Sequence, residues 1–298
     1  MKNNLNTPKK WNQEDKLKWL KEQKIRRSYF EDVVSKLDSY KDYFEIIQYG
    51  QLSFDKEKYP LFALKSKGFK KDKKNVLITG GVHGYETSGV HGVLEFLKNE
   101  ASSYTDAFNL ILVPCVSPWA YESINRWNPN AQDPNRSFYE QSGCEESSFL
   151  MEFLKSTGTD FLLHVDLHET TDSDNTTFRP ALALRDAKIV PEWEIPDGFY
   201  LVGDTQNPQF DFQKAIIDKV KKVTHIAPSD INNKIIGEDI AQEGVINYET
   251  KKLGLCAGIT NAKYCTTTEV YPDSQNVTDK ECIDAQVVVI KAALSHIQ

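Results

Sequence analysis

The stretch NVLITGGVHGYETSGVHGVLEFLK (75–98) decides the fold class. Residues 75–81 form a short apolar run that ends in two glycines, which is typical of a buried strand followed by a tight turn. From about residue 87 to residue 98, apolar side chains recur at the spacing of one helix face: Val90, Val93, Leu94 and Leu97. A strand, a turn and a helix together form a βα unit, the unit from which parallel sheets are built.

Other segments repeat this alternation. Further strands are predicted at 108–114, 160–167 and 264–271, and further helices at 146–156, 211–222 and 282–297. Two β-rich runs at 43–50 and 61–66 are predicted to pair as antiparallel strands at a sheet edge, after a leading helical segment at 12–40 that is broken near Arg26. We therefore expect an α/β fold with a mixed, largely parallel twisted sheet and helices on both faces, in a single domain that covers residues 1–298.

Composition and charge exclude several protein classes. Apolar residues make up 40% of the 298 residues and charged residues 27%, the balance of an ordinary folded globule. The formal net charge of −7 argues against sequence-independent nucleic-acid binding, which needs clustered Lys and Arg. No stretch approaches the roughly 20 apolar residues of a membrane-spanning helix, and the first residues lack the apolar core of a signal peptide, so we expect a cytoplasmic protein without a membrane partner. The five cysteines form no Cys-x-x-Cys pair, which fits reduced thiols.

Candidate metal ligands lie directly after two of the predicted strands. His83 and Glu86 follow the strand at 75–81, and His168 follows the strand at 160–167. Ligands of doubly wound sheets bind beyond the carboxyl ends of the strands, where these residues are expected. Two histidines and a carboxylate, with water in the remaining position, are the usual set for a catalytic zinc. Taken alone, His-x-x-Glu also fits a buried histidine beside a helix-opening glutamate, but the small residues of GGVHGYE leave room for an ion and a substrate.

His164 is the alternative ligand, because His164-x-x-x-His168 would suit a zinc pair on a helix. The segment FLLHVDL (161–167) is rich in β-formers, however, and four residues of a strand span about 13 Å, too far for one ion. We therefore choose His168 and assign His164 to the core or the sheet. Asp166 points to the same side as His168 and is a candidate to orient it, with a purely structural role as the alternative.

With these residues identified, the sequence resembles the zinc carboxypeptidases of the M14 family, which have the carboxypeptidase A-like fold. GGVHGYE (80–86) resembles the family's His-x-x-Glu metal motif, and VDLHE (165–169) supplies the later histidine. SPWAYESINRWNPNAQDPNR (117–136) is similar to the segment that begins with Asn-Pro-Asp-Gly and ends in Asn-Arg, with SPWA in place of the usual first four residues. TTTEVY (266–271) resembles the strand that bears the catalytic glutamate. The four motifs occur in the family's order.

The resemblance implies roles for five further residues. Glu269 would be the general base and acid, and Arg126 would stabilise negative charge on the carbonyl oxygen. Asn135 and a buried Arg136 would hold the substrate carboxylate, because a guanidinium binds a carboxylate through two parallel hydrogen bonds. Tyr248 stands at about the interval before Glu269 where the family often carries a substrate-capping tyrosine, with packing as the alternative role. Outside the resemblance, Arg136 reads as a surface or ion-pair arginine. Glu269 is costly to bury on a sheet strand unless a partner such as metal-bound water compensates it, with a solvent-facing position on an edge strand as the alternative.

The sequence therefore predicts a single catalytic domain with one zinc ion, held by His83, Glu86 and His168, that hydrolyses an amide bond next to a free carboxylate. The first hypothesis is a metallocarboxypeptidase that releases C-terminal amino acids from peptides. The alternatives are an N-acyl amino acid deacylase similar to aspartoacylase and succinylglutamate desuccinylase, and a non-catalytic carboxylate-binding module. Residues 247–262, which include Leu255, are expected to shape a selectivity pocket for an apolar or small side chain.

Overall fold

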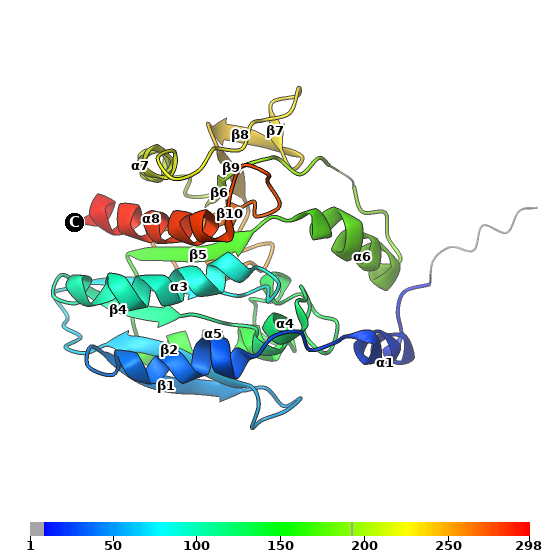
Figure 1. Ribbon diagram of the computed structural model, residues 1–298, viewed down its shortest axis with the longest axis horizontal. Coiled ribbons are helices and arrows are strands. Elements are labelled where there is room, and N and C mark those ends of the chain that lie inside the picture. Colours follow the sequence, from blue (N-terminus) through cyan, green and yellow to red (C-terminus); the bar gives the residue numbers. More distant parts are fainter. Residues whose placement is uncertain (1–8, 192) are drawn as a thin grey trace, which may run out of the picture.

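A ten-stranded twisted sheet runs through the computed structural model, which describes residues 9–191 and 193–298 (Figure 1). Its strands follow the order β1-β2-β4-β3-β5-β10-β6-β9-β8-β7. Their bounds are β1 (Phe44–Gln51), β2 (Pro60–Ser66), β3 (Lys74–Gly80), β4 (Phe108–Val113), β5 (Leu163–Glu169), β6 (Tyr200–Asp204), β7 (Lys234–Ile235), β8 (Glu238–Gln242), β9 (Val245–Tyr248) and β10 (Tyr264–Val270). The pairs β4–β3, β3–β5, β5–β10 and β6–β9 are parallel, and the other neighbouring pairs of this sheet are antiparallel.

The predicted mixed α/β fold is confirmed, but antiparallel pairs are more frequent than the sequence analysis expected. Two of them, β7–β8 and β8–β9, belong to short hairpins that the sequence patterns do not predict. The turns contain Gly237 and Gly244, whose φ angles of 87° and 65° suit tight hairpin connections. Such hairpins need only a few connecting residues, whereas each parallel pair needs a long crossover.

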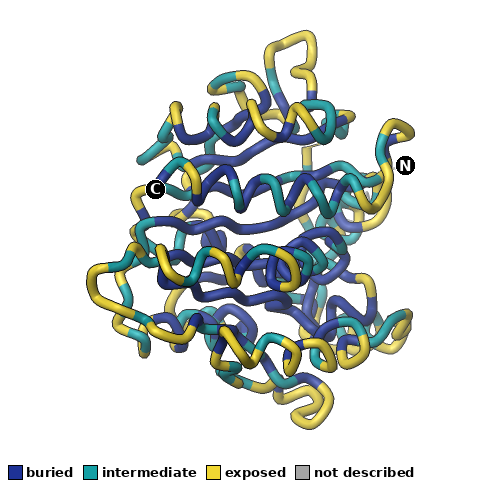
Figure 2. The backbone as a smooth tube through the Cα atoms, turned by 60° about the vertical axis from the view of Figure 1, so that its left-hand side comes forward, coloured by how far each residue is buried: buried dark blue, intermediate teal, exposed yellow. Residues whose placement is uncertain are grey.

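Helices cover both faces of the sheet. They are α1 (Gln13–Glu22), α2 (Ser35–Leu37), α3 (Thr87–Asn99), α4 (Pro118–Ser123), α5 (Glu145–Thr157), α6 (Arg179–Asp186), α7 (Phe210–Val220) and α8 (Asp279–Ile297). Helices α3, α7 and α8 lie side by side on one face, and α5 covers the other (Figure 1). Successive side chains of β3 point to opposite faces of the sheet, which explains why each face carries its own hydrophobic core. Val76 and Ile78 join the core under α3 and α8, while Leu77 joins the core under α5. Figure 2 shows that the central strands between these layers are buried.

Most elements of the first half match their predicted positions. The leading segment consists of α1, a break at 23–29, and the short helical turn η1 (Phe30–Val34) that continues into α2, so the predicted interruption near Arg26 is confirmed. The antiparallel pairing of β1 with β2 at the sheet edge is confirmed as well. Strand β5 continues to Glu169, two residues beyond its predicted end, so His168 lies within the strand. All five cysteines carry free thiols, as predicted.

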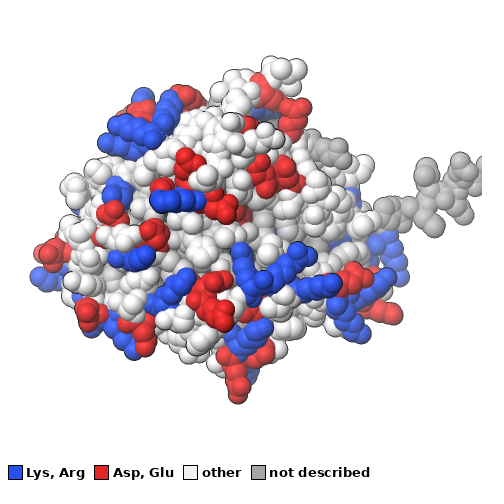
Figure 3. Space-filling view, viewed as in Figure 1, with Lys and Arg blue, Asp and Glu red and all other residues white. Residues whose placement is uncertain are grey.

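The surface carries charges of both signs. Figure 3 shows acidic and basic side chains interspersed over the face that it presents. No helix within the described ranges combines the length and the hydropathy of a membrane-crossing segment.

The central strands determine where a site can form. Strands β3, β5 and β10 are neighbours and run parallel, so their carboxyl ends meet at one edge of the sheet. His83 follows β3, while His168 of β5 and Glu269 of β10 are direct partners in the strand register. Side chains from three distant parts of the sequence therefore meet at this edge.

Candidate active site

Three potential metal ligands meet at the ends of β3 and β5. His83 lies in the turn after β3, Glu86 directly precedes α3, and His168 lies near the end of β5. One donor atom from each residue lies within 4.8 Å of the other two. The Glu86 carboxylate stands between the imidazoles, with Oε1 2.6 Å from His83 Nδ1 and Oε2 2.6 Å from His168 Nδ1. The structure thus brings together, in buried positions, the three residues that the sequence analysis named as ligands.

A second carboxylate lies behind each histidine. His83 Nε2 is 2.9 Å from Asp133 Oδ1, and His168 Nε2 is 2.9 Å from Asp166 Oδ2. When the proton of each ring sits on Nε2 and is donated to these carboxylates, the lone pair of each Nδ1 points toward Glu86. This is the arrangement in which a histidine binds a metal, and it gives Asp166 the orienting contact with His168 that the sequence suggested.

The chemistry of this donor set fits a divalent metal ion such as zinc. Glu86 Oε2 is buried and makes no hydrogen bond of good geometry within the described residues, so it is a polar atom that a cation would satisfy. Burial raises the pKa of Glu86, but the charges of protonated His168 and His83 outweigh this effect and hold the pKa below its ordinary value. A cation that replaces those ring protons supplies the same positive charge and keeps the carboxylate ionised.

His164 belongs to a different group on the same face of β5. Donor atoms of His164, Asp166 and Cys256 lie within 4.8 Å of one another. The Thr79 hydroxyl lies among them, because it donates to Asp166 Oδ1 at 2.6 Å, is 3.1 Å from His164 Nε2 and accepts from the Cys256 thiol at 3.6 Å. This hydrogen-bonded hydroxyl accounts for the grouping without a metal. Burial lowers the pKa of His164 to about 4, so the ring is neutral and His164 is a buried histidine of the sheet.

Glu269 faces the pocket from β10. Its Oε2 accepts a hydrogen bond from Thr170 Oγ1 at 2.7 Å, and Thr170 in turn bonds the Tyr200 hydroxyl at 2.7 Å. Strand β10 lies between β5 and β6, so the alternative of an edge-strand residue is wrong. Burial, with the Glu86 charge as the second cause, raises the pKa of Glu269 to about 8. A carboxylate with this environment, beside a candidate metal site, is suited to proton transfer near neutral pH.

Arg126 lines the same pocket and is held from two sides. Its Nε donates to Asp133 Oδ2 at 2.9 Å, while its Nη1 is 3.2 Å from both Asp174 Oδ1 and the Tyr85 hydroxyl. Asp133 therefore joins Arg126 to His83 through its two carboxylate oxygens. The predicted oxyanion residue and the predicted metal ligand belong to one hydrogen-bonded network.

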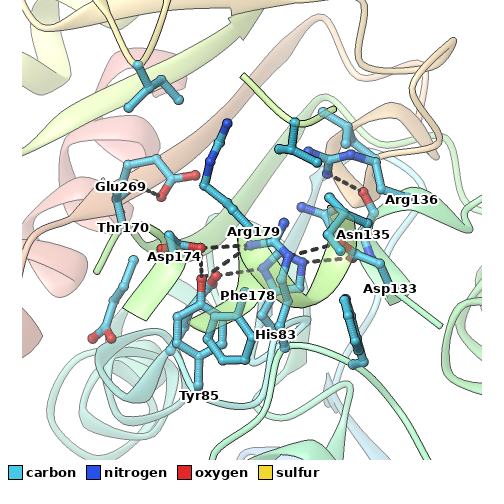
Figure 4. Close-up of a pocket in the computed structure, with 18 of the residues that line it drawn as sticks. His83, Tyr85, Asp133, Asn135, Arg136, Thr170, Asp174, Phe178, Arg179 and Glu269 are labelled. Atoms are coloured by element: carbon cyan, nitrogen blue, oxygen red, sulfur yellow. Dashed lines mark hydrogen bonds and ion pairs between the residues drawn. The ribbon is translucent and has the colours of Figure 1, made fainter. Parts of the chain in front are cut away.

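Asn135 and Arg136 line the pocket in surroundings that differ from those expected. Asn135 is buried, with Oδ1 accepting from the Cys256 backbone N–H at 2.7 Å and Nδ2 3.5 Å from His168 Nε2. Arg136 is exposed, which corrects the expectation of a buried guanidinium, and its Nη1 donates to Asn135 O at 2.7 Å. Glu269 and Arg136 lie at opposite sides of the view in Figure 4. Arg136 is therefore better placed than the buried Asn135 to meet a substrate carboxylate.

Residues 247–262 contribute less to the pocket than expected. Tyr248 and Leu255 line it, whereas Ile259 and Thr260 line a separate depression, which corrects the predicted selectivity pocket. Tyr248 lies on β9 and also packs against the hydrophobic cluster of the outer strands. Tyr248 therefore has the packing role that was its alternative, and it also lines the pocket.

The outer wall of the pocket comes from a segment to which the sequence analysis gave no role. The cavity has a volume of about 480 Å³. Its outer wall is built by the helical turn η5 (Asp174–Phe178), by α6 and by residues 187–191 and 193–195, and it includes Phe178, Arg179, Leu182, Arg185, Val190 and Trp193. Figure 4 labels Phe178 and Arg179 of this wall. The Arg179 guanidinium stacks on the Trp193 ring, with Cζ 3.3 Å from the ring centroid. Substrate contacts are thus available from a region without a recognisable motif.

The site residues that sequence reasoning missed include Tyr85, Asp133, Asp174 and Trp193. Two of them carry a usable signal, since Tyr85 stands inside GGVHGYE and Asp133 forms the Asp-Pro turn before Asn-Arg. Nothing local marks Asp174 or Trp193, because these side chains reach the pocket only through the tertiary path of the chain after β5.

Comparisons with known proteins agree with this geometry. Residues 72–189 match the family described as the succinylglutamate desuccinylase/aspartoacylase catalytic domain. No curated protein matches the chain in sequence.

Solved structures similar to this chain include a candidate metallopeptidase from Shewanella denitrificans, with a TM-score of 0.66 and 17% identity over 90% of this chain and 88% of the other. A metallo-carboxypeptidase from Burkholderia cenocepacia has a TM-score of 0.62 and 14% identity over 90% of this chain and 68% of the other. Bovine thrombin-activatable fibrinolysis inhibitor has a TM-score of 0.60 and 13% identity over 94% of this chain and 98% of the other. The chain therefore has the fold of the metallo-carboxypeptidases, and its residues 72–189 are similar to the succinylglutamate desuccinylase/aspartoacylase catalytic domain.

Proposed function

We propose that this protein is a zinc-dependent hydrolase that cleaves an amide bond next to a free carboxylate. The observation that carries the proposal is the meeting of two chemical groups at one cavity. His83, Glu86 and His168 form a compact donor set for one ion, and Glu269 enters the same cavity from the adjacent strand. A metal site alone could be structural, but a neighbouring carboxylate with a raised pKa supports catalysis.

The residues around this site can divide the reaction among them. Zinc in a site of two histidines and a glutamate supplies Lewis acidity, which polarises a carbonyl and acidifies water. Glu269 takes a proton from the attacking water on Oε1, because its Oε2 is occupied by Thr170, and returns that proton to the departing amine nitrogen. Arg126 stabilises the charge that develops on the carbonyl oxygen. Arg136 at the exposed rim pairs with the substrate carboxylate.

The size of the cavity favours a small substrate. Its volume of about 480 Å³ is in the range of pockets that enclose small molecules. Release of a C-terminal amino acid from a short peptide is the reaction that we favour, in line with the carboxypeptidase-like fold. Deacylation of an N-acyl amino acid is the second candidate, because the family match at 72–189 points to that branch.

Substrate panels separate these reactions. Purified protein loaded with zinc is assayed on N-blocked dipeptides and on N-acyl amino acids, with the zinc content measured on the same sample. Turnover of the blocked dipeptides is expected, and turnover of the N-acyl amino acids alone would replace the carboxypeptidase proposal with the deacylase. If fully zinc-loaded protein hydrolyses neither class, the non-catalytic carboxylate-binding module becomes the better description.

The role of Arg136 can be tested by the substitution Arg136→Ala. Wild-type protein should prefer a substrate with a free carboxylate over its amidated form, and the variant should lose at least about tenfold of that preference, because a charged hydrogen-bonded pair is removed. The preference is measured as the ratio of kcat/KM for the two substrates. Lys252→Ala, which removes an exposed cation that does not line the pocket, is the control. An unchanged ratio in Arg136→Ala would place the carboxylate clamp elsewhere.

A further inference from the structure

Two segments far apart in the sequence hold the Arg126 guanidinium on one side. The Tyr85 hydroxyl lies 3.2 Å from Arg126 Nη1 and donates to Asp174 Oδ1 at 2.8 Å. Asp174 Oδ1 also accepts from Arg126 Nη1 at 3.2 Å, so the three groups form a closed triangle. Figure 4 labels two of its corners, Tyr85 and Asp174. Tyr85 belongs to the metal motif between His83 and Glu86, whereas Asp174 belongs to the outer wall of the pocket.

Tyr85 is itself fixed in place. Its backbone N–H donates to Asn125 O at 3.1 Å, so it holds the chain directly before Arg126 as well as the guanidinium. Its ring packs on Phe178 with 4.6 Å between the ring centroids, and the residue is only 5% exposed. A hydroxyl on so constrained a ring can occupy only a small range of positions.

Asp174 is fixed as well. Its Oδ2 accepts a hydrogen bond from the Thr171 backbone N–H at 2.9 Å, which leaves Oδ1 for Tyr85 and Arg126. On the opposite side of the guanidinium, Asp133 Oδ2 takes Arg126 Nε. The guanidinium therefore has anchors at Nε and Nη1, and its rotation about the Cζ–Nε axis would break at least one of them.

We propose that Tyr85 and Asp174 are positioning residues that hold Arg126 in the orientation needed to stabilise the carbonyl oxygen during amide hydrolysis. The inference rests on the proposed function for its catalytic consequence, but the restraint on Arg126 exists without substrate. A donor that is already oriented before the reaction costs no reorganisation when charge develops, which is why such donors act mainly on kcat. Tyr85 also couples this orientation to the metal motif, because it stands between the proposed ligands His83 and Glu86 in the sequence.

The kinetics of Tyr85→Phe test whether the orientation of Arg126 affects kcat. This variant removes one oxygen atom and keeps the ring, so kcat should fall about tenfold while KM and zinc content stay close to wild type. Arg126→Ala should lose about 100-fold in kcat, and the double variant should be no slower than Arg126→Ala alone, because Tyr85 acts through Arg126. Tyr59→Phe is the matched control, since Tyr59 is a buried tyrosine whose hydroxyl donates to Glu122 at 2.9 Å and does not line the pocket.

A substrate-free measurement separates this inference from the proposed function. Arginine side-chain NMR signals of the zinc-loaded protein should show slow rotation of the Arg126 guanidinium in wild type and in Tyr59→Phe, and faster rotation in Tyr85→Phe and Asp174→Asn, with Arg126→Lys identifying the signal. If wild-type protein hydrolyses no amide but rotation is faster in both variants, the proposed function fails and the restraint on Arg126 stands. Unchanged rotation in Tyr85→Phe, or additive losses in the double variant, would overturn the inference.

Discussion

The inner and outer walls of the pocket are built in different ways. The inner wall consists of the ends of β3, β5 and β10, where one hydrogen-bonded group joins His83 and His168 to their carboxylates and a second group joins Glu269 to Thr170. The outer wall consists of η5, α6 and residues 187–191 and 193–195, and besides Asp174 it contributes rings, aliphatic side chains and arginines. This difference supports the proposal that the inner wall carries most of the chemistry and that the outer wall, apart from the positioning residue Asp174, holds the substrate. Substitutions in the two walls should therefore change different kinetic constants.

The largest effect is expected from His168→Ala on the inner wall. Removal of one of three ligands should reduce bound zinc from about one ion per chain to less than about 0.1, with at least a 1000-fold loss of kcat, because the remaining donors cannot complete the site. Zinc is measured by elemental analysis after dialysis against a weak chelator. His164→Gln on the same strand is the control and should retain its zinc, since His164 bonds Thr79 instead of facing Glu86. Loss of zinc from the control but not from His168→Ala would reverse the choice between the two histidines.

A smaller effect is expected from Glu269→Gln, which should keep its zinc and lose at least about 100-fold in kcat. The base must be ionised to accept a proton, so kcat/KM of wild type should rise with pH through the pKa of Glu269. Burial raises that pKa to about 8, and a nearby cation would lower it, so the rise should be centred at or below pH 8. The variant should lose this rise, whereas Glu249→Gln, an exposed glutamate beyond β9, should keep it. A wild-type rate in Glu269→Gln would show that another group is the base.

The same division between the walls explains how much could be predicted from the sequence. Strands β3 and β4 are recognisable because both faces are covered, which produces apolar runs, whereas β5 and β10 are recognisable from their β-forming residues. Strand β8, with the sequence EDIAQ, is largely exposed and has no such run. Helix α6 is not predicted from the sequence because of the prolines around it, although Pro180 stands in its first turn, where proline is compatible with a helix. Local pattern therefore reveals elements whose burial is uniform and misses those that depend on neighbouring segments.

The site follows the same rule. His83, Glu86 and His168 could be named because each stands at the end of a predictable strand, and the parallel arrangement of those strands requires their ends to meet. Asp174 and Trp193 do not directly follow a strand end, and their positions depend on how residues 170–191 and 193–198 fold back over the cavity. One prediction about burial is wrong. The expected role in binding the substrate carboxylate suggested that Arg136 is buried, and the structure places it at the exposed rim.

The smallest of these effects, and the one that tests the outer wall, is expected from Trp193→Ala. The Trp193 ring lies under the Arg179 guanidinium, and its backbone oxygen accepts from Asn175 Nδ2 at 2.8 Å, so the backbone anchor survives the substitution while the stacked surface is lost. Loss of one cation–π contact and part of an apolar wall should raise KM about threefold to tenfold and leave kcat within about twofold of wild type. Trp119→Phe, a substitution of a buried tryptophan that packs on Phe54 and does not line the pocket, should leave both constants unchanged. A fall in kcat comparable to that of Glu269→Gln would mean that the outer wall takes part in the chemistry, because a wall that only holds substrate contributes equally to the ground state and the transition state.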